Sequence, residues 1–236
     1  LAEIRAVPIF ETRRRKTREG LRLGCLSGSV DLLPLAAEKK AMELLAEYGC
    51  RGSLTPIGDT EYGQFEIQGE NTCMVAVVTE LFQQGEMNVL IGTKSLLGEG
   101  WDAPCINSLI LATYVGSFML SNQMRGRSIR ADQNQPEKTG NIWHLACIFP
   151  QKQGKTKQAD FTGDYEMLAR RFNAFLGVSW KDSLIESGME RLALPAFQSR
   201  DEMEAVNRLM LKRAADRGAL RERWRHAIRE IHGEME

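Results

Sequence analysis

Hydrophobic positions in the first 150 residues follow two alternating patterns: short continuous apolar runs and longer amphipathic stretches. Continuous runs fill residues 88–93, 108–115 and 141–149, and a shorter run over residues 22–29 leads into a turn of small residues. Such runs are typical of strands buried on both faces, and when helices join them they favour a parallel sheet. The pattern therefore predicts an α/β fold with a mostly parallel sheet flanked by helices.

Two amphipathic stretches separate these runs. Residues 34–49 have helical spacing and end at Gly49, a common helix stop, and residues 73–85 also end at a glycine. Residues 50–70 are rich in Gly, Thr and Asp, and predict a loop with one short strand near residues 65–67.

The pattern changes after residue 150. Residues 151–163 are polar and predict a linker, whereas residues 164–236 have the spacing of helices, beginning with an amphipathic stretch over 164–177. Ser199 and Glu202 have the spacing of a capping box, which opens a helix with an apolar stripe. That stripe consists of Met203, Val206, Leu209 and Met210. We therefore expect a domain over 1–150, a linker and a C-terminal helical extension.

Composition narrows the class of protein. The chain is 43% hydrophobic and 26% charged, which is typical of a globular protein. It has no signal-peptide pattern and no apolar run near the roughly 20 residues that span a bilayer, so we expect a cytoplasmic protein with no membrane partner. Five cysteines form no CxxC pair and three histidines add no metal-ligand spacing, which predicts reduced thiols and no metal site. The chain begins at Leu1, and we expect it to be a piece of a longer protein.

The formal net charge of zero hides a segregation along the chain. Residues 1–22 carry seven Lys or Arg and three Asp or Glu, whereas residues 23–102 carry four and twelve. A protein that simply coats DNA would be more uniformly basic. Any contact with a polyanion is therefore expected to be local, from loops and helix starts.

The stretch GTKSLLGEGWDAP, residues 92–104, follows a predicted strand directly. Glycines such as Gly98 and Gly100 allow a ligand to approach the backbone closely, and a hydroxyl such as that of Thr93 can bind a phosphate. The carboxylate of Asp102 can accept from a ribose hydroxyl or hold an arginine. An ordinary glycine-rich connection between a strand and a helix is the alternative.

A second polar constellation, QMRGRSIR, occupies residues 123–130. Helical spacing places Gln123, Arg127 and Arg130 on one face. The planar guanidinium is well shaped to grip phosphate oxygens. A solvated, salt-bridged surface turn is the alternative.

Taken in order, the two constellations read T-x(6)-G-x-D-x-P, a strand, and then Q-x-x-G-R-x-x-R. This order resembles the second RecA-like domain of superfamily 2 helicases and translocases, most closely the bacterial DEAD/DEAH-type proteins. Their motif V is matched by Thr93, Gly100 and Asp102, and their motif VI by Gln123, Gly126, Arg127 and Arg130. Met124 and Ile129 depart from the commonest form of motif VI.

The resemblance implies that ATP, with Mg, binds between this domain and an N-terminal RecA-like ATPase domain that supplies the metal ligands. Arg130, and after it Arg127, would stabilise the charge that develops on the transferred phosphoryl group. Gln123 would sense the γ-phosphate, and Gly100 would line the nucleotide site. Asp102 would face the ribose or orient an arginine.

The resemblance also implies a nucleic-acid partner, DNA or RNA, contacted through its backbone by Thr93 and by the turn of Ser27 and Gly28. The GKT at residues 154–156 lacks the first glycine of a phosphate-binding loop, because position 149 is Phe149. An acidic box after a strand is also missing, so the isolated chain is not expected to hydrolyse ATP. A RecA-like nucleotide-binding or interaction module without motor activity is the alternative.

The last predicted helix carries a basic stripe. Arg213, Arg217, Arg221 and Arg225 recur every four residues. The stripe is read as a solvated face, with a phosphate track or a docking face as alternatives. Trp224 is expected to pack against the α/β domain.

Overall fold

The structure is a computed structural model that describes residues 5–16, 20–68, 71–93, 101–112, 118–147, 163–179, 181–182, 184–197 and 199–233. The chain divides into two compact units. The first unit comprises Leu1–Leu109 and Val115–Gly140, and the second comprises Ile110–Tyr114 and Asn141–Glu236. In the described residues no helix combines the length and the apolar character needed to cross a membrane.

The first unit contains a five-stranded sheet with the order β3-β4-β2-β1-β5. Its strands are β1 (Leu23–Leu26), β2 (Asp31–Pro34), β3 (Arg51–Pro56), β4 (Tyr62–Gln68) and β5 (Val89–Gly92). Within this sheet β1 and β5 pair in parallel, and the other three pairs of described strands are antiparallel. The protein is therefore α/β, with a mixed sheet.

The prediction of a mostly parallel sheet is wrong for these five strands, because two of the connections between them are short. A turn over residues 27–30 returns the chain from β1 as β2, and residues 57–61 join β3 to β4. Such short connections can join only antiparallel neighbours. Residues 51–68, within the stretch predicted as a loop with one short strand, form the β3–β4 hairpin.

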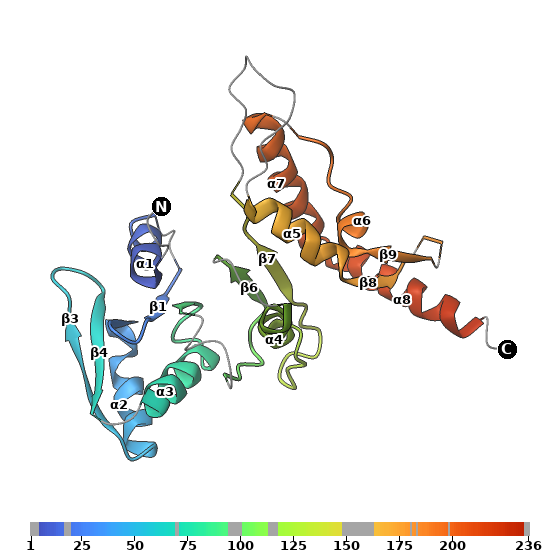
Figure 1. Cartoon of the computed structure of the whole chain (residues 1–236). Coiled ribbons are helices and arrows are strands. Elements are labelled where there is room, and N and C mark those ends of the chain that lie inside the picture. Colours follow the sequence, from blue (N-terminus) through green and yellow to red (C-terminus); the bar gives the residue numbers. More distant parts are fainter. Residues whose placement is uncertain are drawn as a thin grey trace. The chain divides into compact units, whose positions relative to one another are not determined.

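Helices cover both faces of this sheet (Figure 1). On one face, α1 (Ala6–Arg14) buries Phe10 edge-on against Tyr62, with ring centroids 5.0 Å apart. On the other face, α2 (Glu38–Glu47), which follows a 3₁₀ turn at Leu35–Ala37, packs beside α3 (Asn71–Gln83). Because side chains alternate between the faces of a strand, Leu32 faces α1 and Leu33 faces α2 and α3.

The two predicted helices of this unit are confirmed with shifted ends. Gly49 and Gly85 follow α2 and α3 and adopt φ angles of 68° and 80°, in the left-handed region that favours glycine. These backbone conformations explain why both glycines stop a helix.

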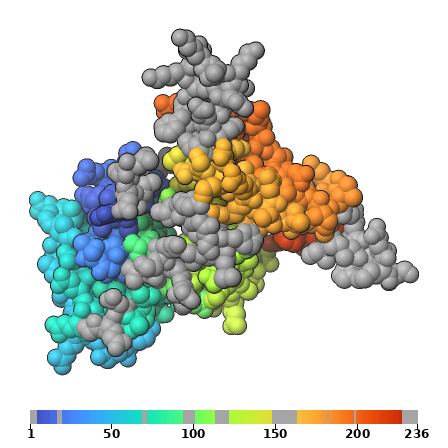
Figure 2. Space-filling model, in the orientation of Figure 1, coloured from blue at the N-terminus to red at the C-terminus, as the bar shows by residue number. Residues whose placement is uncertain are grey.

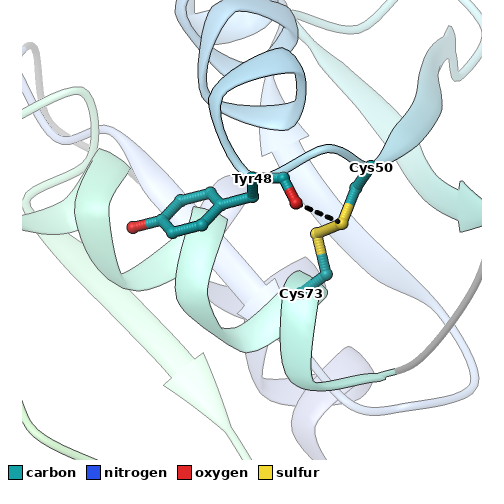
Figure 3. Close-up of a disulfide and its surroundings, with 3 residues drawn as sticks. All are labelled: Tyr48, Cys50 and Cys73. Atoms are coloured by element: carbon teal, nitrogen blue, oxygen red, sulfur yellow. Dashed lines mark hydrogen bonds between the residues drawn. A yellow bond between two sulfur atoms is a disulfide. The ribbon is translucent and has the colours of Figure 1, made fainter.

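The expected set of reduced thiols is wrong for two cysteines. Cys50 and Cys73 form a disulfide, and the Tyr48 carbonyl oxygen lies 3.5 Å from Cys50 Sγ (Figure 3). The cause is the fold: the chain leaves α2 at Gly49 directly beside the first turn of α3. Cys25 is a buried thiol, and burial raises its pKa to about 12, with a further contribution from the charge of Asp31.

The second unit is mainly helical. Strand β6 (Ser108–Leu111), of which residues 110–111 belong to this unit, pairs with β7 (Asn141–His144) in a two-stranded sheet. Beyond them come α5 (Gly163–Asn173), the hairpin of β8 (Leu176–Val178) and β9 (Ile185–Ser187), α6 (Gly188–Leu192), α7 (Arg200–Ala215) and α8 (Arg217–Gly233). His144 meets Phe172 edge-on at 5.1 Å, which packs α5 on β7.

Sequence predictions for this unit have mixed outcomes. The capping box of Ser199 and Glu202 is confirmed at the start of α7. The predicted helix over 164–177 is too long, since it ends at Asn173 and Leu176 begins a strand. The predicted boundary at residue 150 lies outside the described residues, as does the predicted linker over 151–163 except for Gly163, which begins α5.

The second unit exposes many apolar side chains. Leu176, Leu184 and Ile185 on or beside the β8–β9 hairpin are each at least 66% exposed. This part of the chain forms the orange surface in Figure 2. Trp224 on α8 is 60% exposed. Its expected packing against the α/β domain stays a prediction.

Candidate functional site

The first unit brings the two polar constellations into contact. The Arg130 guanidinium donates from Nη1 to Oδ1 of Asp102, although the residues are 28 positions apart in the chain. About half of each side chain is exposed. Sequence analysis gave Asp102 two possible roles, to accept from a ribose hydroxyl or to hold an arginine. The contact observed here corresponds to the second role.

Arg127 lies close to this ion pair but is buried. It is 7% exposed, and its Nε atom has no hydrogen-bond partner among the described residues. Burial lowers the pKa of Arg127, the positive charge of Arg130 lowers it further, and Asp102 opposes both. A buried cation with an unused donor is costly unless an anion compensates it. The arrangement is therefore suited to an anionic group beside Arg127.

Helix α4 (Phe118–Ser128) carries Arg127 in its last turn. Because the helix ends at Ser128, Arg130 lies beyond it, and the predicted common helical face of Gln123, Arg127 and Arg130 is wrong. Gln123 is exposed whereas Arg127 is buried. The two arginines are brought together by the turn after α4, in which the Arg130 amide donates to the Arg127 carbonyl at 3.4 Å.

A tryptophan fixes the segment that carries Asp102. The Trp101 indole donates from Nε1 to Thr79 Oγ1 of α3 at 2.7 Å. Trp101, Ala103 and Ile106 form a small buried cluster against α3 and β5. Asp102, between two buried neighbours, therefore projects outward. Sequence reasoning missed this role of Trp101, although a tryptophan within a polar, glycine-rich stretch is a signal for such an anchor.

Lys138 ties the same segment to the loop after α4. Its Nζ donates to the carbonyl oxygens of Pro104 and of Ile106, the latter at 2.9 Å. Nearby, Gly140 passes so close to the Ser128 carbonyl that a Cβ there would clash with it. These contacts hold the end of α4 and residues 101–106 at a fixed separation, which sequence analysis did not anticipate.

The residues predicted to contact nucleic acid also lie side by side. Parallel pairing of Leu26 with Gly92 places Ser27 next to Thr93, and the Thr93 amide donates to the Leu26 carbonyl at 3.1 Å. Ser27 and Gly28 donate their amides to Asp31 Oδ1, at 2.8 and 3.1 Å. A phosphate that used these two amides would have to displace the carboxylate of Asp31, a residue that the sequence reasoning overlooked.

Gly98 and Gly100 lie outside the described residues. The described residues include no cluster of three or more His, Cys, Asp or Glu that could hold a metal ion. A scan of the chain against protein-family models finds no match, and a search of the curated proteins finds none either. The function is therefore inferred from the side chains of the site.

Proposed function

We propose that this chain is the second motor domain of an ATP-dependent nucleic-acid helicase or translocase. In this proposal it supplies Arg127 and Arg130 to ATP held by a first RecA-like domain. The observation that carries the proposal is the Asp102–Arg130 ion pair beside the buried Arg127. It joins the positions that resemble motif V and motif VI.

The two arginines have different surroundings and, in the proposal, different tasks. Arg127 is buried and its Nε donor has no partner among the described residues, so it suits a phosphate that is present before and during the reaction. Arg130 is half exposed and paired with Asp102, so it can exchange that carboxylate for charge that grows on the γ-phosphoryl group. Mg, with ligands from the first domain, neutralises phosphate charge when bound.

The RecA-like part of the fold is also a proposal. The parallel pair of β1 and β5 is assigned to a RecA-like core, with the antiparallel β2, β3 and β4 as an elaboration of one edge. Thr93 and Ser27, at the carboxyl ends of the parallel pair, would face the nucleic-acid backbone. Ligands of α/β sheets commonly bind at such strand ends.

The mixed sheet favours a second candidate: a RecA-like nucleotide-binding or interaction module without motor activity. Three of its four strand pairs are antiparallel, which differs from the mostly parallel sheet of a motor domain. In this candidate the two arginines bind a nucleotide but do not accelerate ATP hydrolysis.

Substitution of Arg130 in the protein that includes the first RecA-like domain distinguishes the candidates. In a motor, Arg130→Ala lowers kcat for ATP by about 10³-fold with little change in nucleotide affinity, because the arginine acts on transition-state charge. Arg130→Lys does not fully restore kcat, since an ammonium lacks the planar fork. In a binding module, Arg130→Ala weakens nucleotide affinity and no turnover is lost.

Arg200→Ala is the matched control, because Arg200 is also an exposed arginine paired with a carboxylate, that of Glu204. It leaves turnover unchanged. Unchanged turnover in Arg130→Ala rules out the motor role of this arginine. The isolated chain, as a further check, hydrolyses no ATP above background.

A further inference from the structure

Helix α8 presents a tryptophan to solvent. Trp224 is 60% exposed, and all residues from 221 to 226 are exposed. Tryptophan is the largest apolar side chain and is usually mostly buried. Its exposure on a polar helix points to a surface that is covered by a ligand.

The surroundings of Trp224 are strongly basic. Residues 208–226 carry seven Lys or Arg and two Asp or Glu, in a chain with formal net charge zero, and one of the seven, Arg208, pairs with Glu204 at 3.9 Å. One of the two carboxylates, Glu222, pairs with Arg225 at 2.8 Å, and the other, Asp216, accepts the Ala219 amide at 3.0 Å. The excess charge is therefore complementary to a polyanion.

Helical spacing puts the tryptophan and the cations together. Arg217, Leu220, Arg221 and Trp224 follow the i, i+3, i+4, i+7 pattern of one helical face. Arg217 donates to Asn141 Oδ1 of β7 at 3.0 Å, which holds the start of α8 in place. Beyond it, residues 221–226 are all exposed, so Trp224 lies with Arg221 and Arg225 in a part of the helix that is open to solvent.

We propose that this face of α8 binds single-stranded nucleic acid without sequence preference. Trp224 stacks against a base, while Arg221 and Arg225 contact phosphates, Arg225 by exchanging Glu222 for a phosphate oxygen. A single strand is specified because a base offers its π-face to a tryptophan only when it is unstacked from a duplex. The ligand class rests on the proposed function, and the site lies in the other unit from Thr93 and Ser27.

Binding of a labelled 12-nucleotide deoxythymidine strand to the whole chain, followed by fluorescence anisotropy, tests the proposal. Trp224→Ala weakens binding by about tenfold or more, and Trp224→Phe retains most of the affinity, because stacking needs an aromatic ring. Leu211→Ala is the matched control: Leu211 on α7 is 59% exposed and apolar but not aromatic. It leaves affinity unchanged, and a thermal melt verifies that each variant is folded.

A salt series tests the phosphate contacts. Arg221→Ala and Arg225→Ala each reduce the slope of log affinity against log salt by about 0.7, the value for one phosphate contact on a single strand. Arg200→Ala, at the start of α7, leaves the slope unchanged. Duplex DNA of the same length binds more weakly than the single strand.

Three results overturn the proposal: no binding of the single strand, equal affinity of wild type and Trp224→Ala, or equally strong competition by polyglutamate. The last result assigns the face to an acidic protein partner. These three results concern strand binding, whereas the proposed motor function is tested separately, by the ATP turnover of Arg130→Ala. Failure of one proposal can therefore be told from failure of the other. Loss of motor activity in Arg130→Ala with unchanged strand binding in Trp224→Ala discards only the α8 site.

Discussion

The two units keep their helices in place by different means. In the first unit, α1 and α2 begin without a side-chain cap but bury Phe10, Leu44 and other side chains against the sheet. In the second unit, α6 and α7 each begin with a capping box and contain no buried residue. Tertiary burial thus determines the helices of the first unit, whereas local hydrogen bonds have a larger share in the second.

The two units also differ in how many large side chains they bury. The first unit fully buries large side chains such as Phe65, Leu33 and Leu81. In the second unit, Leu111, Phe197 and Ser179 are the buried residues among those described. The difference predicts that truncation of an apolar side chain to alanine costs more in the core of the first unit than at an exposed position of the second.

The largest effect is expected from Phe65→Ala. Phe65 is 1% exposed at the centre of the main core, so its loss leaves a cavity and lowers the free energy of unfolding by about 3–5 kcal/mol. Urea unfolding followed by circular dichroism measures the change. Leu184→Ala is the counterpart in the second unit, where 66% exposure limits the change to about 0.5 kcal/mol. Similar losses for the two variants would contradict the comparison.

Removal of the disulfide is expected to have the next largest effect. Cys50 and Cys73 are separated by 23 positions, and a loop of that length corresponds to about 3 kcal/mol of unfolding free energy. Thermal melts with and without reductant measure it. The double variant Cys50→Ser, Cys73→Ser should melt at the same temperature under both conditions. A wild type that is equally insensitive to reductant would show that the bond contributes nothing.

A smaller effect is expected from the capping box of α7. Ser199→Ala removes the acceptor of the Glu202 amide and lowers unfolding free energy by about 1 kcal/mol. Ser199→Asp, which keeps an acceptor, restores most of it. Helical circular dichroism at 222 nm, an ordinary measure of helix, follows both variants. Equal stability of Ser199→Ala and wild type would show that the local bonds are not what begins this helix.

The smallest effect is expected from protonation of Glu190, which caps α6, at low pH. The Ser187 amide donates to Glu190 and holds the pKa of this carboxyl below its ordinary value of 4.5. A lowered pKa means that the carboxylate stabilises α6 at neutral pH and that this contribution is lost as the pH falls through the lowered pKa. An NMR titration of Glu190 measures it, with Glu190→Gln as the pH-insensitive control. Titration at or above 4.5 would contradict the capping role.

Sequence analysis succeeded where the determinants are local. The helix stops at Gly49 and Gly85 and the cap at Ser199 depend on residues within a few positions, and all three are confirmed. The β3–β4 hairpin was missed because only Leu54 of β3 is buried, so that edge strand has little hydrophobic pattern. The disulfide was missed because the spacing of 23 residues has no signature of its own.

The candidate site shows the same division. Asp102 and Arg130 were both singled out, and an arginine partner was one of two interpretations of Asp102. Their contact depends on the turn after α4 and on the anchor of Trp101 to Thr79, which no local pattern specifies. The burial of Arg127 likewise follows from the packing of the unit and not from its neighbours in sequence.

The exposure of the Asp102–Arg130 pair determines how natural variation at these positions would be detected. An ion pair with both side chains about half exposed contributes about 0–1 kcal/mol to stability. Variants at either position should therefore accumulate in cells at nearly normal levels. A mutational screen scored by protein abundance would class both positions as tolerant, and a screen scored by growth under dependence on the protein's activity would class them as intolerant.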